Sequence, residues 1–216
     1  MSSLKRPSLI TVLIIAAALA VAGQTTAHQV ETPAKARSGV SYGLLVDNSG
    51  SFRTIFERVI NLAGDVIDES GPLDEGFLLT FVDTPKIVLR QDFTSSKSEL
   101  HDAAENMYIE GGQTAILDAV KAATEHINEK AEFGSRALIL ITDGEERDSR
   151  SSAAEVLTLL KASNVRVYVL GISESKVTTK LIDQLTKGTG GMKFLPRNTA
   201  EMKNAVKEIF VAIHSK

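Results

Sequence analysis

The sequence predicts an α/β fold: a doubly wound, mostly parallel central sheet with helices on both faces and one antiparallel edge strand. Short apolar segments alternate with amphipathic segments from residue 39 to the C-terminus, as in a chain of strand–helix units. Several apolar segments, including residues 137–141 (ALILI) and 167–171 (VYVLG), have no polar face. Such continuous runs are typical of parallel strands that helices cover on both sides. With 216 residues, 43% of them hydrophobic, the chain is long enough for one domain of this kind.

Each strand and helix is expected from its own pattern of apolar residues. In the segment 52–69 apolar side chains recur at the spacing of one helix face, at Phe52, Ile55, Phe56, Val59, Leu62, Ala63 and Val66. Further helices are predicted at 96–109, 114–131, 151–163, 178–189 and 199–215. Strands are predicted at 40–46, 75–82, 86–93, 136–142, 165–172 and 192–196. Only Asp83, Thr84 and Pro85 separate the second strand from the third, which predicts a tight hairpin-like connection there.

The N-terminal residues have the pattern of a secretory signal peptide. Lys5 and Arg6 precede an apolar run from Leu9 to Gly23, and small residues follow as far as Ala27. We therefore expect a signal peptide at 1–27, a linker at 28–38 and a folded domain at 39–216, in a protein exported to the periplasm or the extracellular space. The apolar run is short for a membrane span, which needs about 20 residues. An uncleaved membrane anchor is the alternative, and it is the only membrane association that we expect.

Composition excludes several classes of function. The formal net charge is −3 and aromatic residues make up 5% of the chain, so neither a basic patch nor a stacking platform for nucleic acid is expected. The chain has no cysteine, which excludes a disulfide, a thiolate nucleophile and a cysteine-based zinc site.

Five oxygen-bearing side chains are predicted where strands end and helices begin. Asp47, Ser49 and Ser51 follow the first strand, Thr114 opens the helix 114–131, and Asp143 follows the strand 136–142. The carboxyl ends of parallel strands share one edge of the sheet, where such folds bind ligands. Hard oxygen donors favour Mg²⁺, Mn²⁺ or Ca²⁺ over zinc. Two carboxylates leave such a binding site able to take an external anion, for example a carboxylate from a partner protein.

These residues, in this order, resemble the von Willebrand factor type A domain. The stretch VDNSGS matches its D-x-S-x-S motif, GGQTAILDAV supplies its threonine and ITDGEERDS its second aspartate, so all five positions of a metal-ion-dependent adhesion site are filled. The similarity runs from about Gly39 to the C-terminus, and the motifs are similar to those of secreted bacterial members, particularly those described from acidobacteria.

The resemblance implies a role in binding, not in catalysis. It implies that Ser49 and Ser51 bind a metal directly, that Asp47 and Asp143 bind it directly or through water, and that Thr114 changes between the two modes. It also implies that a Glu or Asp of a protein partner takes the sixth coordination position. Specificity would then depend on the loops around the metal, which we expect at 145–151 and 92–98.

Structural interpretations of the same residues remain open at this point. Ser51 and Thr114 are also possible helix N-caps, and Asp143 with Gly144 is also a possible turn. The acidic run of Glu145, Glu146 and Asp148 is interpreted as a solvated loop; the alternative is that it tunes the charge of the site or disfavours acidic partners nearby. Asp118 lies on the same helical face as Thr114, where it either orients a loop near the metal or is simply exposed.

Two alternative functions also remain open. The first is a magnesium-dependent hydrolase resembling a haloacid-dehalogenase phosphatase, but that motif needs a second Asp where Ser49 stands, and no catalytic Lys is identifiable. The second is a metal-free scaffold that binds a partner through its helices.

Overall fold

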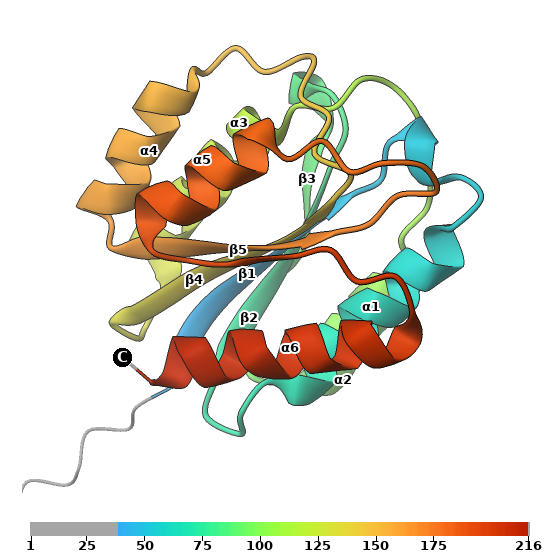
Figure 1. Ribbon diagram of the computed structural model, residues 1–216. Coiled ribbons are helices and arrows are strands. Elements are labelled where there is room, and N and C mark those ends of the chain that lie inside the picture. Colours follow the sequence, from blue (N-terminus) through green and yellow to red (C-terminus); the bar gives the residue numbers. More distant parts are fainter. Residues whose placement is uncertain (1–38, 216) are drawn as a thin grey trace, which may run out of the picture. The chain divides into compact units, whose positions relative to one another are not determined.

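The computed structural model describes residues 39–215, which form a six-stranded sheet between two layers of helices (Figure 1). The strands are β1 (Val40–Asp47), β2 (Glu75–Phe81), β3 (Ile87–Thr94), β4 (Ser135–Thr142), β5 (Val165–Gly171) and β6 (Lys193–Phe194). Their order in the sheet is β3-β2-β1-β4-β5-β6. Strand β3 at one edge runs antiparallel to β2, and the other neighbouring pairs are parallel. The predicted fold class is therefore confirmed, including its antiparallel edge strand.

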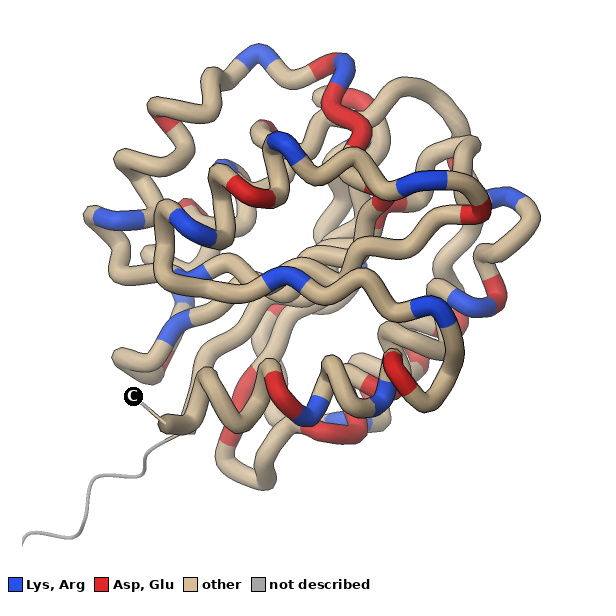
Figure 2. Tube along the Cα trace, in the orientation of Figure 1, with Lys and Arg blue, Asp and Glu red and all other residues tan. Residues whose placement is uncertain are grey.

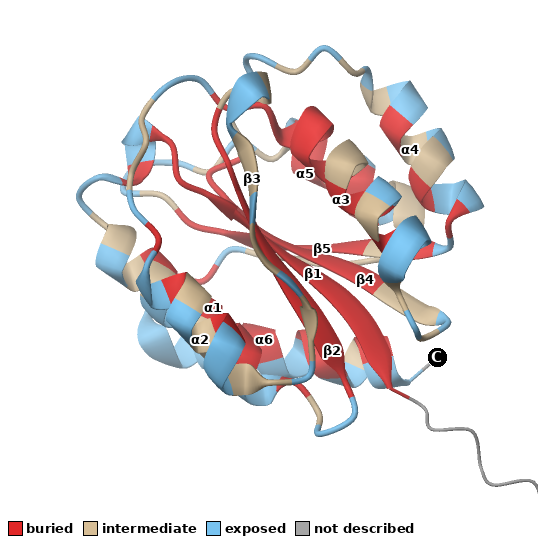
Figure 3. Cartoon of the chain, turned by 180° about the vertical axis from the view of Figure 1, so that it is seen from behind, coloured by how far each residue is buried: buried red, intermediate tan, exposed pale blue. Residues whose placement is uncertain are grey.

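Helices cover both faces of the sheet (Figure 3). The helices α1 (Phe56–Glu69), α2 (Lys97–Glu105) and α6 (Thr199–His214) pack on one face, and α3 (Ile116–Lys130), α4 (Ala153–Ala162) and α5 (Lys180–Thr189) on the other. The side chains of β1 alternate between the two faces of the sheet. Leu44 and Val46 pack in the core under α1, α2 and α6, and Leu45 packs in the core under α3, α4 and α5. Burying each such side chain contributes about 1.5–3 kcal/mol, so apolar packing supports the fold.

The first helix begins later than its sequence pattern predicts. Residues Gly50–Phe52 form a 3₁₀ helix, in which the amides of Phe52 and Arg53 bond to the carbonyls of Ser49 and Gly50, and α1 starts only at Phe56. The spacing of three between Phe52 and Ile55 fits a 3₁₀ turn as well as an α-helix, which explains the difference. Helix α2 also ends before the predicted residue 109, and β6 has two residues.

The parallel strands β1, β2 and β4 end at the same edge of the sheet, which we call the carboxyl edge. Residues 92–98 do not lie there, so the expectation that they surround the metal is wrong. Because β3 is antiparallel, its end lies at the opposite edge, where Thr94 pairs with Gly76 near the start of β2.

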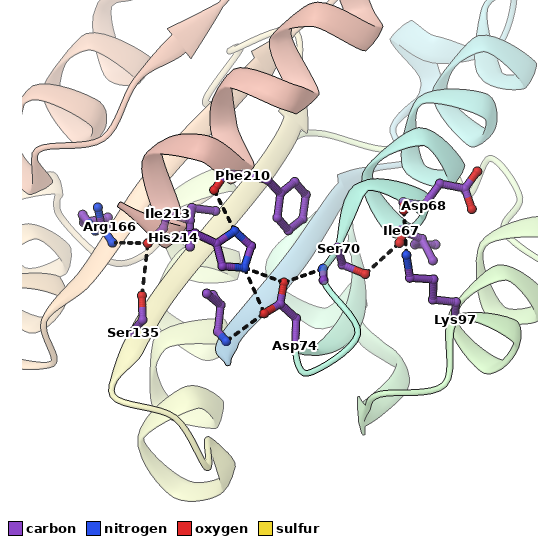
Figure 4. A network of polar contacts seen from close by, with 12 residues as sticks. Ile67, Asp68, Ser70, Asp74, Lys97, Ser135, Arg166, Phe210, Ile213 and His214 are labelled. Atoms are coloured by element: carbon purple, nitrogen blue, oxygen red, sulfur yellow. Dashed lines mark hydrogen bonds and ion pairs between the residues drawn. The ribbon is translucent and has the colours of Figure 1, made fainter. Parts of the chain in front are cut away.

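The opposite edge, which we call the amino edge, contains a network centred on the buried carboxylate of Asp74 (Figure 4). Its Oδ1 atom accepts from the amide of Val40 at 3.0 Å, and its Oδ2 atom accepts from the amide of Gly71 at 2.7 Å. The Nε2 atom of His214 lies 3.0 Å from the same Oδ2 atom, so Asp74 joins the start of β1, the loop before β2 and the end of α6.

Between residues 39 and 215, none of the helices has the length and apolarity needed to cross a membrane. The predicted signal peptide at 1–27 and the linker at 28–38 lie outside the described residues, and both stay predictions.

Candidate metal-binding site

Asp47 lies at the centre of the predicted site, at the carboxyl end of β1. Its side chain is completely buried. The Oδ1 atom accepts from the amide of Ser49 at 3.1 Å, and the Oδ2 atom accepts from the Thr142 hydroxyl at 2.8 Å. The hydroxyls of Ser49 and Ser51 are 3.1 Å apart, with Ser49 buried and Ser51 exposed. The turn after β1 therefore places a carboxylate and two hydroxyls together, with one hydroxyl at the surface.

The electrostatics of Asp47 are unusual for a carboxylate. Burial raises its pKa to about 7, the nearby charge of Asp143 adds to that rise, and the hydrogen bonds from Ser49 and Thr142 offset part of it. The ion pairs found within residues 39–215 include neither Asp47 nor Asp143. A buried carboxylate without a cation is costly, so this site favours a positive charge from outside the chain.

Asp143 follows β4, and its side chain is also buried. Its Oδ1 atom accepts from the amide of Glu145 at 3.0 Å. The next residue, Gly144, has φ +80°, and a Cβ atom there would lie 2.0 Å from the Thr178 carbonyl oxygen. This tight turn, which requires glycine, directs the chain away from the sheet directly after the carboxylate.

Thr114 is buried just before α3, and its main chain is held by the loop that follows Asp143. Its carbonyl oxygen accepts from the amides of Arg147 at 2.8 Å and Asp148 at 3.1 Å. The amide of the next residue, Ala115, donates to the carbonyl of Val82, the residue that follows β2. Thr114 is thus anchored to the segments that follow β2 and β4.

The structure brings the five predicted residues to the same edge of the sheet. β1 lies beside β4, which places Asp47 next to Thr142 and close to Asp143. A Cβ atom on Gly50 would lie 3.9 Å from the Cα atom of Gly111, so the first loop also contacts the segment before Thr114.

The helix-cap interpretations of Ser51 and Thr114 are wrong. The N-cap residue of α1 is Ile55 and that of α3 is Ala115, and neither helix has a side-chain cap bond at that position. The hydroxyls of Ser51 and Thr114 are therefore not used as caps.

Residues 39–215 contain no group of three or more His, Cys, Asp or Glu side chains arranged to hold a metal. The hydroxyls of Ser49 and Ser51, which are neutral oxygen donors, lie in the same turn as Asp47, and Thr114 carries a third hydroxyl at the same edge of the sheet.

Sequence reasoning missed the role of Glu146, whose carboxylate is hydrogen-bonded to the protein although it lies in the loop expected to be solvated. Its Oε2 atom accepts from the amide of Leu117 at 3.0 Å and from the Ser149 hydroxyl at 2.9 Å. Its neighbours Arg147 and Asp148 are exposed, and acidic and basic positions lie next to each other along this loop (Figure 2). An acidic residue that follows a strand gives no local signal that it caps a distant helix.

Asp118 orients a loop and is not an exposed carboxylate, since its side chain is largely buried. It accepts from the amides of Arg150 and Ser151, both at 2.9 Å, and from the Thr84 hydroxyl at 2.6 Å. Burial alone would raise the pKa of Asp118, but the hydrogen bonds from Ser151, Thr84 and Arg150 outweigh it and hold the pKa at about 2.

Comparison with known proteins identifies the class of this domain. The model of the von Willebrand factor type A domain family matches residues 43–209, and the chain belongs to this family. No curated protein matches the chain in sequence.

Solved structures share the fold at low sequence identity. The protein BatB from Bacteroides thetaiotaomicron is 20% identical with a TM-score of 0.67, and the match covers 82% of this chain and 100% of that one. A von Willebrand factor type A protein from Catenulispora acidiphila is 18% identical with a TM-score of 0.68, covering 82% of this chain and 43% of that one. Proximal thread matrix protein 1 from the mussel byssus is described with a zinc-occupied MIDAS motif. It is 19% identical with a TM-score of 0.67, and the match covers 82% of this chain and 46% of that one.

Proposed function

We propose that this protein is a metal-dependent protein-binding module that holds one divalent cation at Asp47, Ser49, Ser51, Thr114 and Asp143. The observation that carries the proposal is the completely buried carboxylate of Asp47, which has no cationic partner among the described residues. A divalent cation supplies the missing charge.

The donor chemistry fits Mg²⁺, with Mn²⁺ or Ca²⁺ as alternatives. Two carboxylates and three hydroxyls are hard oxygen donors, and Mg²⁺ usually takes one or two protein carboxylates and keeps several waters. Because a mussel relative is described with zinc in its motif, zinc belongs in any metal titration.

The partner that we propose is a protein with an acidic side chain. At most two negative charges from Asp47 and Asp143 face the ion, and Ser51 lies at the surface. A carboxylate from outside can therefore complete the coordination without entering the core.

From its N-terminal sequence we also propose that the protein is exported. Mass spectrometry of the mature N-terminus tests this proposal. A chain that starts at Met1 or Ser2 in the cytosol would contradict it.

Calorimetric titration with Mg²⁺, Mn²⁺ and Zn²⁺ tests the metal site. We expect one site per chain in the wild type and a large loss of affinity in Ser49→Ala. The matched control is Ser98→Ala, which removes an exposed hydroxyl on α2. Equal binding by all three proteins would place the metal elsewhere.

Affinity capture from a native extract then tests the binding function. Partners should be lost with chelator and with Ser49→Ala, while the far-UV circular dichroism spectrum of Ser49→Ala stays that of the wild type. Partners that survive both treatments would show that the contact uses another surface.

A further inference from the structure

The start of α3 is capped by side chains from a distant loop. The helix has no capping side chain of its own at Ala115. Instead, the carboxylate of Glu146 accepts from the amide of Leu117, and the hydroxyl of Ser149 accepts from the amide of Asp118 at 3.1 Å. An acidic group at this end of a helix also interacts favourably with the helix dipole.

Residues at the start of α3 in turn accept hydrogen bonds from main-chain amides of the loop after β4. The carboxylate of Asp118 accepts from the amides of Arg150 and Ser151, and the carbonyl of Thr114 accepts from the amides of Arg147 and Asp148. Each segment thus satisfies main-chain donors of the other, so the contact fixes the main chain of both segments.

Glu146 also stabilises its own loop. Its Oε1 atom accepts from the amide of Ser149 at 3.0 Å, while its Oε2 atom accepts from the Ser149 hydroxyl. Both carboxylate oxygens are therefore used, and an amide side chain in the same place could accept through only one of its atoms.

Two glycines lie between residues 114–118 and the segment that contacts the loop after β1. Just before them, the carbonyl of Tyr108 accepts from the Asn48 side chain at 2.9 Å, and the amide of Glu110 donates to the carbonyl of Asn48 at 3.1 Å. Gly111 and Gly112 follow with φ of +72° and +109°, and a Cβ atom on Gly112 would lie 2.8 Å from the Val82 Cγ1 atom. The chain thus passes from contacts with the first loop to contacts with the loop after β4 within a few residues.

We propose that Asp118 and Glu146 are positioning residues of the metal site, which lock residues 114–118 against residues 143–151 so that Thr114 and Asp143 are presented to the ion as one unit. This inference rests on the metal site proposed above. Neither carboxylate needs to touch the metal, because each acts through the main chain that carries a ligand. Groups that hold metal ligands in place typically change metal affinity 10–100-fold when they are lost.

The test compares Asp118→Asn and Glu146→Gln with the wild type by calorimetric titration with Mg²⁺ and Mn²⁺, far below the unfolding temperature of each protein. Each variant keeps the side-chain volume and loses one acceptor oxygen. We expect affinity to fall about tenfold or more in both. The matched control is Glu155→Gln, because Glu155 caps the start of α4 in its own capping box and has no bond to residues 114–118. Its metal affinity should equal that of the wild type.

Amide NMR spectra without metal provide a second measurement that does not depend on the proposed function. The amide signals of Thr114 and Asp143 should move in both variants and stay in place in Glu155→Gln. If the wild type binds metal and both variants bind it equally tightly while folded, the positioning role is wrong and the metal site stands. If the wild type binds no metal, the proposed function is wrong, and unmoved Thr114 and Asp143 signals would overturn the positioning role as well.

Discussion

A carboxylate is buried at each of the two edges of the sheet, and the two carboxylates differ in their hydrogen-bond partners and in the charged groups beside them. At the amino edge, Asp74 accepts from two main-chain amides and lies 3.0 Å from the ring of His214, a basic side chain of the same domain (Figure 4). At the carboxyl edge, Asp47 accepts from one amide and one hydroxyl, and a second carboxylate, Asp143, lies nearby.

The difference separates a structural carboxylate from one suited to a ligand. Asp74 joins segments far apart in sequence, and removing it should loosen the fold. Asp47 is held in place but has no cationic partner among residues 39–215, so its ionised form carries an electrostatic cost that a cation at this site would offset. A substitution at one edge should therefore change stability, and a substitution at the other should change ligand binding.

The largest expected effect is the loss of metal binding in Asp47→Asn. Asparagine has the same shape and can keep one hydrogen bond to Ser49 or Thr142, but it removes the charge. We expect Mg²⁺ affinity to fall about a thousandfold or more, equivalent to about 4 kcal/mol. Calorimetric titration measures this change.

Asp74→Asn is the control at the other edge, and it should bind Mg²⁺ as the wild type does. Wild-type affinity in Asp47→Asn would contradict the contrast between the two edges.

The second prediction concerns the stability of the metal-free protein against pH. Well below pH 4 Asp47 is protonated in both the folded and the unfolded chain, so it has no effect. As the pH rises from about 4 to about 7, the unfolded chain loses this proton while the folded chain keeps it, because burial raises the folded pKa to about 7. Stability therefore falls across this range, and above pH 7 the loss reaches at most about 4 kcal/mol.

Urea unfolding in chelator at pH 5 and pH 8 measures the larger part of this loss, which falls between these two values. The wild type should lose stability relative to Asp47→Asn between the two values, and Mg²⁺ at pH 8 should restore it. Asp118, with a folded pKa of about 2, is ionised in the folded and the unfolded chain from pH 5 to pH 8, so its stabilising contribution does not change between these two values. If the free energies of unfolding of the wild type and Asp47→Asn differ by the same amount at pH 5 and pH 8, the prediction is wrong.

The sequence predicts the fold well because the fold rests on local patterns. The apolar runs of β4 and β5 and the helical spacing in α1 are visible within a few residues. Asp47, Ser49 and Ser51 could be placed for a similar reason, since they directly follow a predictable strand.

What the sequence does not predict are contacts between distant segments. Glu146 is about 30 residues from the amide that it caps, and Asp74 is 140 residues from His214. Neither pairing has a sequence pattern, because each depends on how loops pack after the sheet has formed. The 3₁₀ turn after Ser49 is a local case, in which the same apolar spacing fits two kinds of helix.

The third prediction is a loss of stability in Asp74→Asn. Asparagine cannot accept from Val40 and Gly71 through both side-chain atoms, so one buried amide loses its partner. The expected cost is about 2 kcal/mol, the range for hydrogen bonds to charged groups. Urea unfolding with Mg²⁺ present measures this cost. If the free energy of unfolding of Asp74→Asn equals that of the wild type, Asp74 does not stabilise the fold as proposed.

The smallest effect is expected when the other partner of Asp74 is removed, in His214→Ala. The histidine side chain is 39% exposed while that of Asp74 is 2% exposed, so water screens the pair from one side. Asp74 also keeps its two amide donors, and the cost should be only about 1 kcal/mol. The control is His101→Ala, whose partner Asp68 lies at a similar distance but is 70% exposed, so its loss should be smaller still. Urea unfolding at low and high salt compares the two variants. If His101→Ala costs as much as His214→Ala, burial of the acid does not set the strength of these pairs, and the contrast between the edges would need another cause.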